Sequence, residues 1–415
     1  MIPQIFILLC FVGLLLYSIV KKKSEVSIFI ISLWCVVAFF GLLYINTSIY
    51  YPGKQPLTVL PYVFLFACFL IYVIPLMGFK IERIVPFRET NLLIGFFIFC
   101  GVISVLPFLE NLVHTMHSAS DPMAFAEFYD RSKTDNSFDM AAHLSKPGKV
   151  FNSITMYFQN ISPFLLLYYL TFKRFNIFIF FGLLFFMANP VLFMFSSGAR
   201  GIPVIVGISF VAYYLLFRHL IPKDRKRTIR LVFLAGVAFV AIIVFYITLS
   251  RFGDTEYSIA EWIYRYIGES MPDFNGDAFY TRAHTNGDNC FPFFQHLIDP
   301  SMAGERNFQH LYHTTGIRMY VYYTFIGDIY IDFGMLFCVL FLLVLALFMK
   351  AGTYLSNGSY SLPVVIIMAL YIKMGIMGYM FMFTKLQPQF TVMTVVLALM
   401  LYVFNAFEEE KIVES

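Results

Sequence analysis

The sequence predicts an all-α fold, a polytopic transmembrane helix bundle, on three observations. Of its 415 residues 60% are hydrophobic and 13% are charged, whereas a soluble domain carries about a quarter charged residues. The mean hydropathy is +0.75. Apolar runs of about 20 residues, the length that crosses a hydrocarbon core, recur along the chain. Inside lipid such runs satisfy their backbone polar groups as helices.

Eleven apolar runs are expected to span the membrane, and none shows the period-2 alternation of an outer-membrane barrel. They cover residues 2–20, 26–45, 58–79, 91–109, 151–172, 175–195, 201–217, 231–249, 333–349, 362–384 and 390–407. We expect a single integral membrane domain over residues 1–415. Two polar segments are long, a first outer loop over 110–150 and a second over 250–319.

Lysine and arginine predict the orientation, because short cytoplasmic connections are enriched in them. With the N-terminus outside, the short inner connections carry sixteen such residues, and the short outer ones carry three, Lys54, Arg200 and Lys385. An odd number of spans then puts the C-terminus inside. Both long loops and the turn 196–201 therefore face outward.

The long loops are expected to contain short helices. Ser120-Asp121-Pro122 is typical of a helix start and precedes an aromatic helix over 125–129. In the second loop, apolar residues recur at helical spacing, namely Ile259, Trp262, Ile263, Tyr266 and Ile267. This stripe fits a helix lying in the outer interface. A helix that caps the bundle without touching substrate fits it equally well.

The sequence contains no motif that predicts metal or nucleotide binding. The six cysteines form no C-x-x-C pair, and His310 and His313 have no further ligand at metal-binding spacing. No Walker, dinucleotide-binding or G-x-S-x-G motif occurs. We therefore expect no metal and no cofactor.

Arginines near the predicted outer ends of the helices are the most informative polar residues. Arg200 lies in a glycine-flanked turn, Arg251 follows a span, and Arg318 precedes the next re-entry. Arg265 and Arg282 lie in the loop between them. A guanidinium is always charged and matches phosphate oxygens, so these residues predict a diphosphate site. Each could instead reach lipid headgroups.

Other polar residues supply candidate bases. His284, close to Arg282, and Glu269 are the candidates for accepting a proton. The segment 324–334, with Asp328 and Asp332, is too polar for an ordinary span and is expected to form a re-entrant hairpin. Lys373 lies inside an apolar run, where a charge is a functional hypothesis by default.

Three pieces of the chain resemble the Wzy-type O-antigen polymerases, which join oligosaccharide repeat units. They are Phe195-Ser196-Ser197-Gly198-Ala199-Arg200-Gly201, the large loop beginning with Arg251, and Tyr330-Ile331-Asp332-Phe333-Gly334. The resemblance implies a metal-independent glycosyltransferase of the bacterial inner membrane with its site facing the periplasm. Arg200 and Arg251 carry over from the resemblance as catalytic candidates, and His284 and Glu269 join them as the candidate bases. Its substrate-binding candidates are Arg265, Arg282, Arg318, Tyr330 and Asp332.

The resemblance also implies the partners. Undecaprenyl-diphosphate-linked glycans would serve as donor and acceptor, membrane lipids would surround the chain, and a chain-length regulator protein is a further candidate. No nucleic-acid partner is expected. Two other functions stay open: an O-antigen ligase, which shares the donor, and a lipid-linked oligosaccharide transporter or flippase. Transporters commonly show internal repeats, and no clear repeat occurs here.

Overall fold

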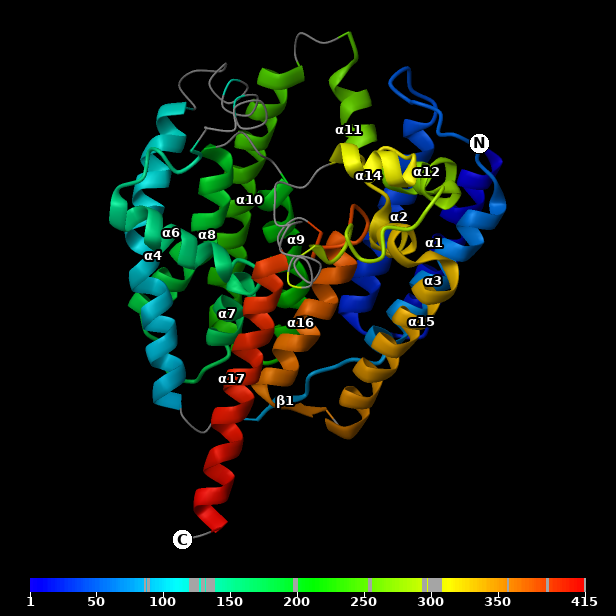
Figure 1. The fold of residues 1–415 in the computed structure, drawn as a ribbon. Coiled ribbons are helices and arrows are strands. Elements are labelled where there is room, and N and C mark those ends of the chain that lie inside the picture. Colours follow the sequence, from blue (N-terminus) through cyan, green and yellow to red (C-terminus); the bar gives the residue numbers. More distant parts are fainter. Residues whose placement is uncertain are drawn as a thin grey trace. The chain divides into compact units, whose positions relative to one another are not determined.

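The computed structural model is built of helices, drawn in Figure 1, and groups into two compact units. The structure describes residues 1–85, 87, 90–118, 127, 131, 139–196, 201–252, 256–292, 297, 308–356, 358–385 and 388–413. Unit 1 comprises Met1–Lys80, Ala260–Gly358 and Leu370–Thr391, and unit 2 comprises Ile81–Ile259, Ser359–Ala369 and Val392–Ser415.

Within the described residues, seven helices are long and apolar enough to cross a membrane. They are α1 (Ile2–Val20), α2 (Glu25–Tyr44), α3 (Val59–Met77), α4 (Thr90–Ser118), α8 (Ile177–Ser196), α10 (Lys223–Phe252) and α15 (Thr324–Ser356). Three further helices contain shorter apolar stretches, namely α9 (Gly201–Phe217), α16 (Leu362–Met377) and, over Pro388–Phe404, α17 (Pro388–Val413). The chain is therefore a membrane-embedded helical protein, as its composition predicts.

The core of unit 1 is aromatic. The Trp34 ring lies 4.5 Å from Phe69 and 5.8 Å from Phe325 between centroids, and its indole N–H donates to the Gly375 carbonyl at 3.0 Å. The Tyr72 hydroxyl donates to the Tyr371 carbonyl, and the Tyr371 hydroxyl donates back to the Tyr72 carbonyl. Because buried polar groups need partners, these bonds fix how α2, α3 and α16 meet.

Short elements complete unit 1 above this core. They are α11 (Ile259–Gly268), α12 (Ser270–Gly276), the 3-10 helix η1 (Ala278–Tyr280) and α14 (Phe308–Thr315). The amphipathic stripe of the sequence is α11, whose side chains are mostly half-buried, with Ile263 exposed. Gly268, its last residue, lies against the backbone of Phe40 and Gly41, where a Cβ would find no room.

Unit 2 is built around α4 and α8. Gly101 and Gly182 face each other so closely that a Cβ on Gly101 would lie 2.9 Å from the Gly182 Cα. The Ser104 hydroxyl donates to the Gly101 carbonyl at 2.7 Å, within the same interface. Small residues commonly allow this approach between membrane helices. The unit also holds α6 (Lys146–Tyr157), α7 (Ser162–Tyr169) and a parallel pairing of β1 (Arg83–Ile84) with β2 (Ser359–Tyr360).

The helix boundaries correct the predicted runs in three places. The run 151–172 is two helices, because Pro163 in the first turn of α7 cannot continue α6. Helix α4 continues to Ser118, into the predicted first loop. Helix α15 begins at Thr324, before the predicted run 333–349, and breaks where Gly334 has φ +73°. The Cys338 thiol lies 3.7 Å from the Ile326 carbonyl, so the chain folds back at this break, in line with the hairpin expected over 324–334. The helix predicted over 125–129 lies, apart from residue 127, outside the described residues.

The close approach of α4 and α8 is testable. Gly101→Ala should lower the melting temperature by several degrees, because the added methyl group meets backbone and overpacking costs about 1–3 kcal/mol. Gly95→Ala, on the same helix with nothing within 4 Å of its Cβ, is the matched control. Thermal unfolding of the detergent-solubilised protein measures both. Equal melting temperatures for the two variants would contradict the packing.

Candidate functional site

A row of three carboxyl groups forms the centre of the candidate site in unit 1. Glu269, Asp273 and Asp277 are four residues apart along α12 and its flanks, so they lie on one helix face. All three side chains are buried. Buried carboxylates are costly unless they are paired or protonated. The row therefore requires cations or protons beside it.

Two arginines supply the opposite charge. The Arg318 guanidinium donates to Asp277 Oδ2 through Nε at 2.9 Å and through Nη2 at 2.7 Å, and it lies 3.5 Å from Asp273 Oδ1. The Arg265 Nε donates to Glu269 Oε2 at 2.9 Å, one turn along the helix. The arginine side chains keep 16% and 28% of their surface exposed, so neither is fully buried.

The loop between α2 and α3 covers the other side of the row. The Lys54 backbone N–H donates to Asp277 Oδ1 at 3.0 Å, and the Arg318 guanidinium lies 4.8 Å from the centre of the Tyr51 ring. Gly53 packs directly on the backbone of Gly276. This cation–π contact and the backbone donor hold Arg318 and Asp277 in one arrangement.

The surroundings of Asp273 favour its protonated form. Burial, and then the neighbouring Glu269, raise the pKa of Asp273 well above 3.8, against the lowering effect of Arg318. Its Oδ2 atom has no hydrogen-bond partner among the described residues. Burial also raises the pKa of Glu269, opposed first by Arg265. Two arginines thus face three buried carboxyl groups.

Two further cations lie beside Gly316, which has φ +66°. A Cβ there would meet Arg282 Cδ at 2.9 Å and Lys54 Nζ at 3.3 Å. Both side chains are exposed. Burial, then the charge of Arg282, lowers the pKa of Lys54. The glycine therefore lets two cations gather next to Asp277.

His284 lies on the exposed surface beside the break in α15. Its Nδ1 atom is 3.2 Å from the Ile331 carbonyl, which can only accept, so Nδ1 carries the hydrogen in the neutral ring. Its Nε2 atom then holds the lone pair, and a Cβ on Gly334 would lie 2.8 Å from it. The Tyr330 hydroxyl donates to the Phe279 carbonyl at 3.0 Å, and its ring meets His284 edge-on. Gly334 leaves Nε2 uncovered.

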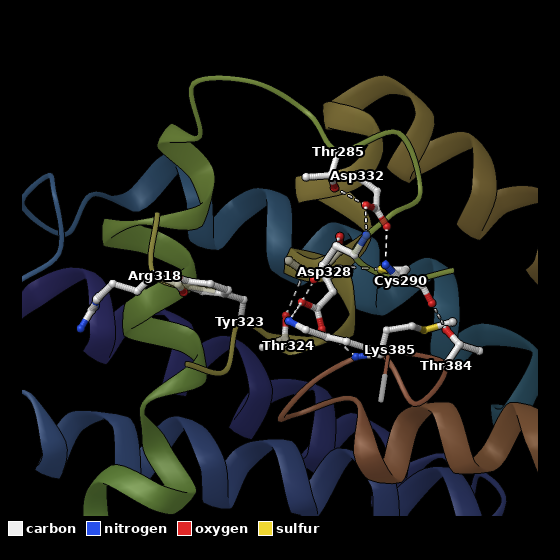
Figure 2. Close-up of polar contacts among 12 residues, drawn as sticks. Thr285, Cys290, Arg318, Tyr323, Thr324, Asp328, Asp332, Thr384 and Lys385 are labelled. Carbon is white, nitrogen blue, oxygen red and sulfur yellow. Dashed lines mark hydrogen bonds and ion pairs between the residues drawn. The ribbon is translucent and has the colours of Figure 1, made fainter. Parts of the chain in front are cut away.

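Asp328 and Asp332, one turn apart on α15, hold two chain segments against the helix, as Figure 2 shows. Asp332 accepts from the backbone N–H groups of Asn289 at 3.0 Å and Cys290 at 2.7 Å, and from the Thr285 hydroxyl. Asp328 accepts from Lys385 Nζ at 2.7 Å.

The other donors to Asp328 are Met382 N, at 2.8 Å, and Asn289 Nδ2, at 3.0 Å. The Thr384 hydroxyl donates to the Cys290 carbonyl at 2.6 Å and joins the two held segments. The contacts of Asp332 are thus with the chain itself and support the His284 loop. Its direct contact with substrate stays a prediction.

The structure brings together part of the predicted site. Glu269, Arg265 and Arg318 meet at the carboxyl row, whereas His284, Tyr330 and Asp332 gather around the break in α15. Arg282 lies beside Lys54. Arg200 lies outside the described residues, and the side chain of Arg251 is likewise not described. Their convergence on one diphosphate stays a prediction.

Sequence reasoning missed Asp273 and Asp277 as partners of the arginines. Their signal was the spacing Glu269-x3-Asp273-x3-Asp277, which puts three carboxyl groups on one helix face. It also used Lys54 and Lys385 only to predict the orientation of the chain in the membrane. Lys385 is buried and paired with Asp328, 57 residues away in sequence, and no local pattern indicates such a pair.

The fold and site define a membrane-embedded helical protein whose first unit holds a buried ion-pair cluster and, at the break in α15, an exposed histidine. Comparison with models of known protein families, with curated proteins and with solved structures gives no match.

The titration of Asp273 gives a pH dependence. Its pKa is raised in the folded state, so its contribution to stability is present below the unfolded value of 3.8 and is lost as the pH rises through the folded value. In Asp273→Asn the amide replaces the acid and does not titrate. The wild type should therefore lose stability relative to this variant as the pH rises from 3.8.

Unfolding by sodium dodecyl sulfate in mixed micelles, over a pH series, measures this difference. Asp224→Asn, at an exposed carboxylate in the first turn of α10, is the control and should follow the wild type. Parallel curves for wild type and Asp273→Asn would show that Asp273 is ionised.

Proposed function

We propose that the chain is a membrane glycosyltransferase that polymerises undecaprenyl-diphosphate-linked oligosaccharide repeat units into an O-antigen or capsular-type polysaccharide. The observation that carries the proposal is an exposed histidine with a fixed tautomer in a loop that also bears a cluster of arginines. An acceptor hydroxyl needs a base, and a diphosphate leaving group needs fixed positive charge. The resemblance to Wzy-type polymerases supports the same reaction.

In this proposal His284 Nε2 takes the proton of the acceptor sugar hydroxyl. The hydroxyl oxygen forms a bond to the anomeric carbon of the donor, and the bond from that carbon to the diphosphate oxygen breaks. The electron pair leaves with undecaprenyl diphosphate. Nδ1 keeps its hydrogen bond to the Ile331 carbonyl, which stabilises the imidazolium that forms.

The guanidinium groups of Arg265, Arg282 and Arg318 would face the charge that develops on the diphosphate. Arginine suits this role because its charge is permanent and its donors form a planar fork. Glu269 and Asp277 are buried behind Arg265 and Arg318, so they position the arginines. With Arg200 and Arg251 these cations would replace a metal, and excess chelator should leave the reaction unchanged.

The proposed membrane arrangement has eleven crossings, with the N-terminus and both long loops in the periplasm. The runs of α9, α16 and α17, and α6 together with α7, would add four crossings to the seven long helices. Lys385 is neutralised by Asp328 in the interior. The short outer connections therefore expose fewer cations than the three that the sequence places in them. This difference supports the proposed orientation.

An O-antigen ligase is the alternative, because it would use the same donor and leaving group. A lipid-linked oligosaccharide transporter is the second. It would bind the diphosphate but would need no base at His284. Glycan analysis of a host strain without the chain separates them. Loss of elongation beyond a single repeat unit indicates a polymerase, and loss of all attachment to the lipid core indicates a ligase.

Replacing His284 tests the transferase directly. His284→Gln should reduce chain elongation by a factor of about 10²–10⁴, the usual contribution of a general base. The protein level should stay unchanged, because surface substitutions usually alter stability by less than about 0.5 kcal/mol. The readout is the glycan ladder of a deletion strain complemented with each variant.

His313→Gln is the matched control, since His313 is an exposed histidine at the end of α14 in the same long loop. It should give the wild-type ladder. A full-length ladder from His284→Gln at normal protein level would remove His284 from the reaction.

The orientation can be tested with single cysteines at exposed positions. Ala283→Cys should react with a membrane-impermeant maleimide in intact cells with a permeabilised outer membrane, because its loop is proposed to face the periplasm. Lys223→Cys, at the start of α10, should react only after the inner membrane is disrupted. Both native side chains are exposed. The reverse labelling pattern would invert the proposed arrangement.

A further inference from the structure

A cavity of about 450 Å³ opens on unit 2, and no step of the proposed reaction uses it. Its lining comes from the last three turns of α4 and from His143, in the turn between α4 and α6. The lining residues are Leu109, Glu110, Val113, His114, His117 and His143. Three imidazoles and one carboxyl group in one cavity are an unusual concentration of titratable groups for a helix in an apolar unit.

The imidazoles do not have the geometry of a metal site. The rings of His114 and His143 are stacked, with centroids 4.1 Å apart and planes 11° apart. Their nitrogen lone pairs therefore lie in parallel planes and do not converge on one point. Across the described part of the chain, no group of three or more His, Cys, Asp or Glu could hold a metal ion. The cavity suits a ligand that accepts hydrogen bonds.

A network of buried amides fixes His143. Asn111 Nδ2 donates to Asn189 Oδ1 at 2.9 Å, so Asn111 Oδ1 is left as an acceptor for His143 Nε2 at 2.7 Å. Asn189 is in turn fixed by its bonds to Asn152 at 2.9 Å and Thr155 at 2.6 Å. A ring held this firmly is preorganised, which is a property of binding sites.

Glu110 does not make the cavity strongly anionic. Its Oε2 atom accepts from the Ser145 backbone N–H at 3.3 Å, and it lies so close to Gly148 that a Cβ there would be 2.1 Å away. The carboxylate therefore faces the first turn of α6, where the helix dipole and free N–H groups offset its charge. Lys149, in the same helix, pairs with Asp139 at 2.6 Å.

One wall of the cavity is apolar and exposed. Leu109 and Val113, one turn apart on α4, keep 49% and 68% of their surface exposed. They continue an exposed apolar row that includes Val102 and Val105 on the same long helix. An apolar row that ends at three imidazoles matches an amphiphilic ligand, with a chain along the helix and a polar head at its end.

We propose that this cavity binds a phosphate group carried on an apolar chain. The phosphate oxygens accept hydrogen bonds from the imidazoles of His114 and His117, and the chain lies along Leu109 and Val113. The His143 ring, held by Asn111, contributes positive charge when it takes up a proton. A phosphate offers three strong acceptor oxygens and about −1.5 to −2 charge at neutral pH, which suits such a site better than a carboxylate.

The electrostatics of His143 favour proton uptake when an anion enters. Burial, then the charge of His114, lowers the pKa of His143 to about 4, while Glu110, Asp139 and the Met140 carbonyl oppose this less strongly. The free cavity therefore holds a neutral ring at pH 7. A bound phosphate reverses the balance, because its negative charge offsets both burial and repulsion. His117, also in the cavity, is exposed and adds a donor.

The inference does not rest on the proposed transferase. It concerns binding, and a binding measurement needs no turnover. A chain that binds lipid phosphate here and makes no glycan would leave the inference intact while contradicting the proposed function. Within the proposed reaction, the site would be a second place for the lipid carrier, separate from the arginines of unit 1.

The test is equilibrium binding of radiolabelled dodecyl phosphate to the purified full chain in a neutral sugar detergent. Dodecyl phosphate should bind at least tenfold more tightly than inorganic phosphate and than dodecanol. His117→Gln and His143→Gln should each weaken its binding at least tenfold. His219→Gln, an exposed histidine between α9 and α10, should bind as the wild type does. The nitrogen NMR signals of labelled histidine should show His143 becoming protonated on binding.

Three results would overturn the inference. Equal affinity for inorganic phosphate would show a free-anion site, and equal affinity for dodecanol would show that the phosphate is not recognised. Unchanged binding by His117→Gln, whose exposed side chain can be replaced without disturbing the core, would place the ligand elsewhere. The melting temperature of His143→Gln should equal that of the wild type. Its loss of binding then cannot be explained by unfolding.

Discussion

The pairing of buried carboxylates with donors from distant parts of the chain is the constraint on which unit 1 depends. A carboxylate taken out of water costs several kcal/mol unless opposite charge and hydrogen bonds replace its hydration. Asp277 obtains both from Arg318 and the 46–58 loop, whereas Asp332 obtains hydrogen bonds alone, from the 285–290 loop. Each pairing pulls an irregular segment onto a helix. The positions of Arg318 and His284 follow from these buried contacts.

Glycine at close approaches is the second requirement. Gly268 and Gly276 bring backbone against backbone at the two ends of α12, which places the carboxyl row against α2 and the 46–58 loop. Gly334 breaks α15 just after Asp332 and leaves room for the His284 ring. In unit 2, Gly101 and Gly182 serve a simpler purpose, because they only let two long helices approach. The same residue type thus shapes a site in one unit and a core in the other.

Hydropathy predicted where the helices lie, because an apolar run inside lipid satisfies its backbone hydrogen bonds by forming a helix. It failed at Pro163, where a proline separates α6 from α7 inside one apolar run. The polarity of 324–334 indicated a hairpin, and the chain does fold back at Gly334. The site was predicted less completely. Residue type identified Arg265, Arg318 and His284, whereas their partners Asp277, Asp273 and Ile331 depend on long-range contacts that no local pattern records.

The ion pair of Asp328 with Lys385 has a consequence for how the protein is made. The carboxylate leaves the ribosome 57 residues before its lysine, and the Met382 amide that also binds it is nearly as late. During synthesis the Asp328 carboxylate therefore has only Asn289 among these partners until that later segment follows. The 285–290 loop, fastened through Asn289 to both aspartates, gains its last support only when the segment after α16 is inserted. A nascent chain without that segment would hold every helix before α16 and still have no finished site.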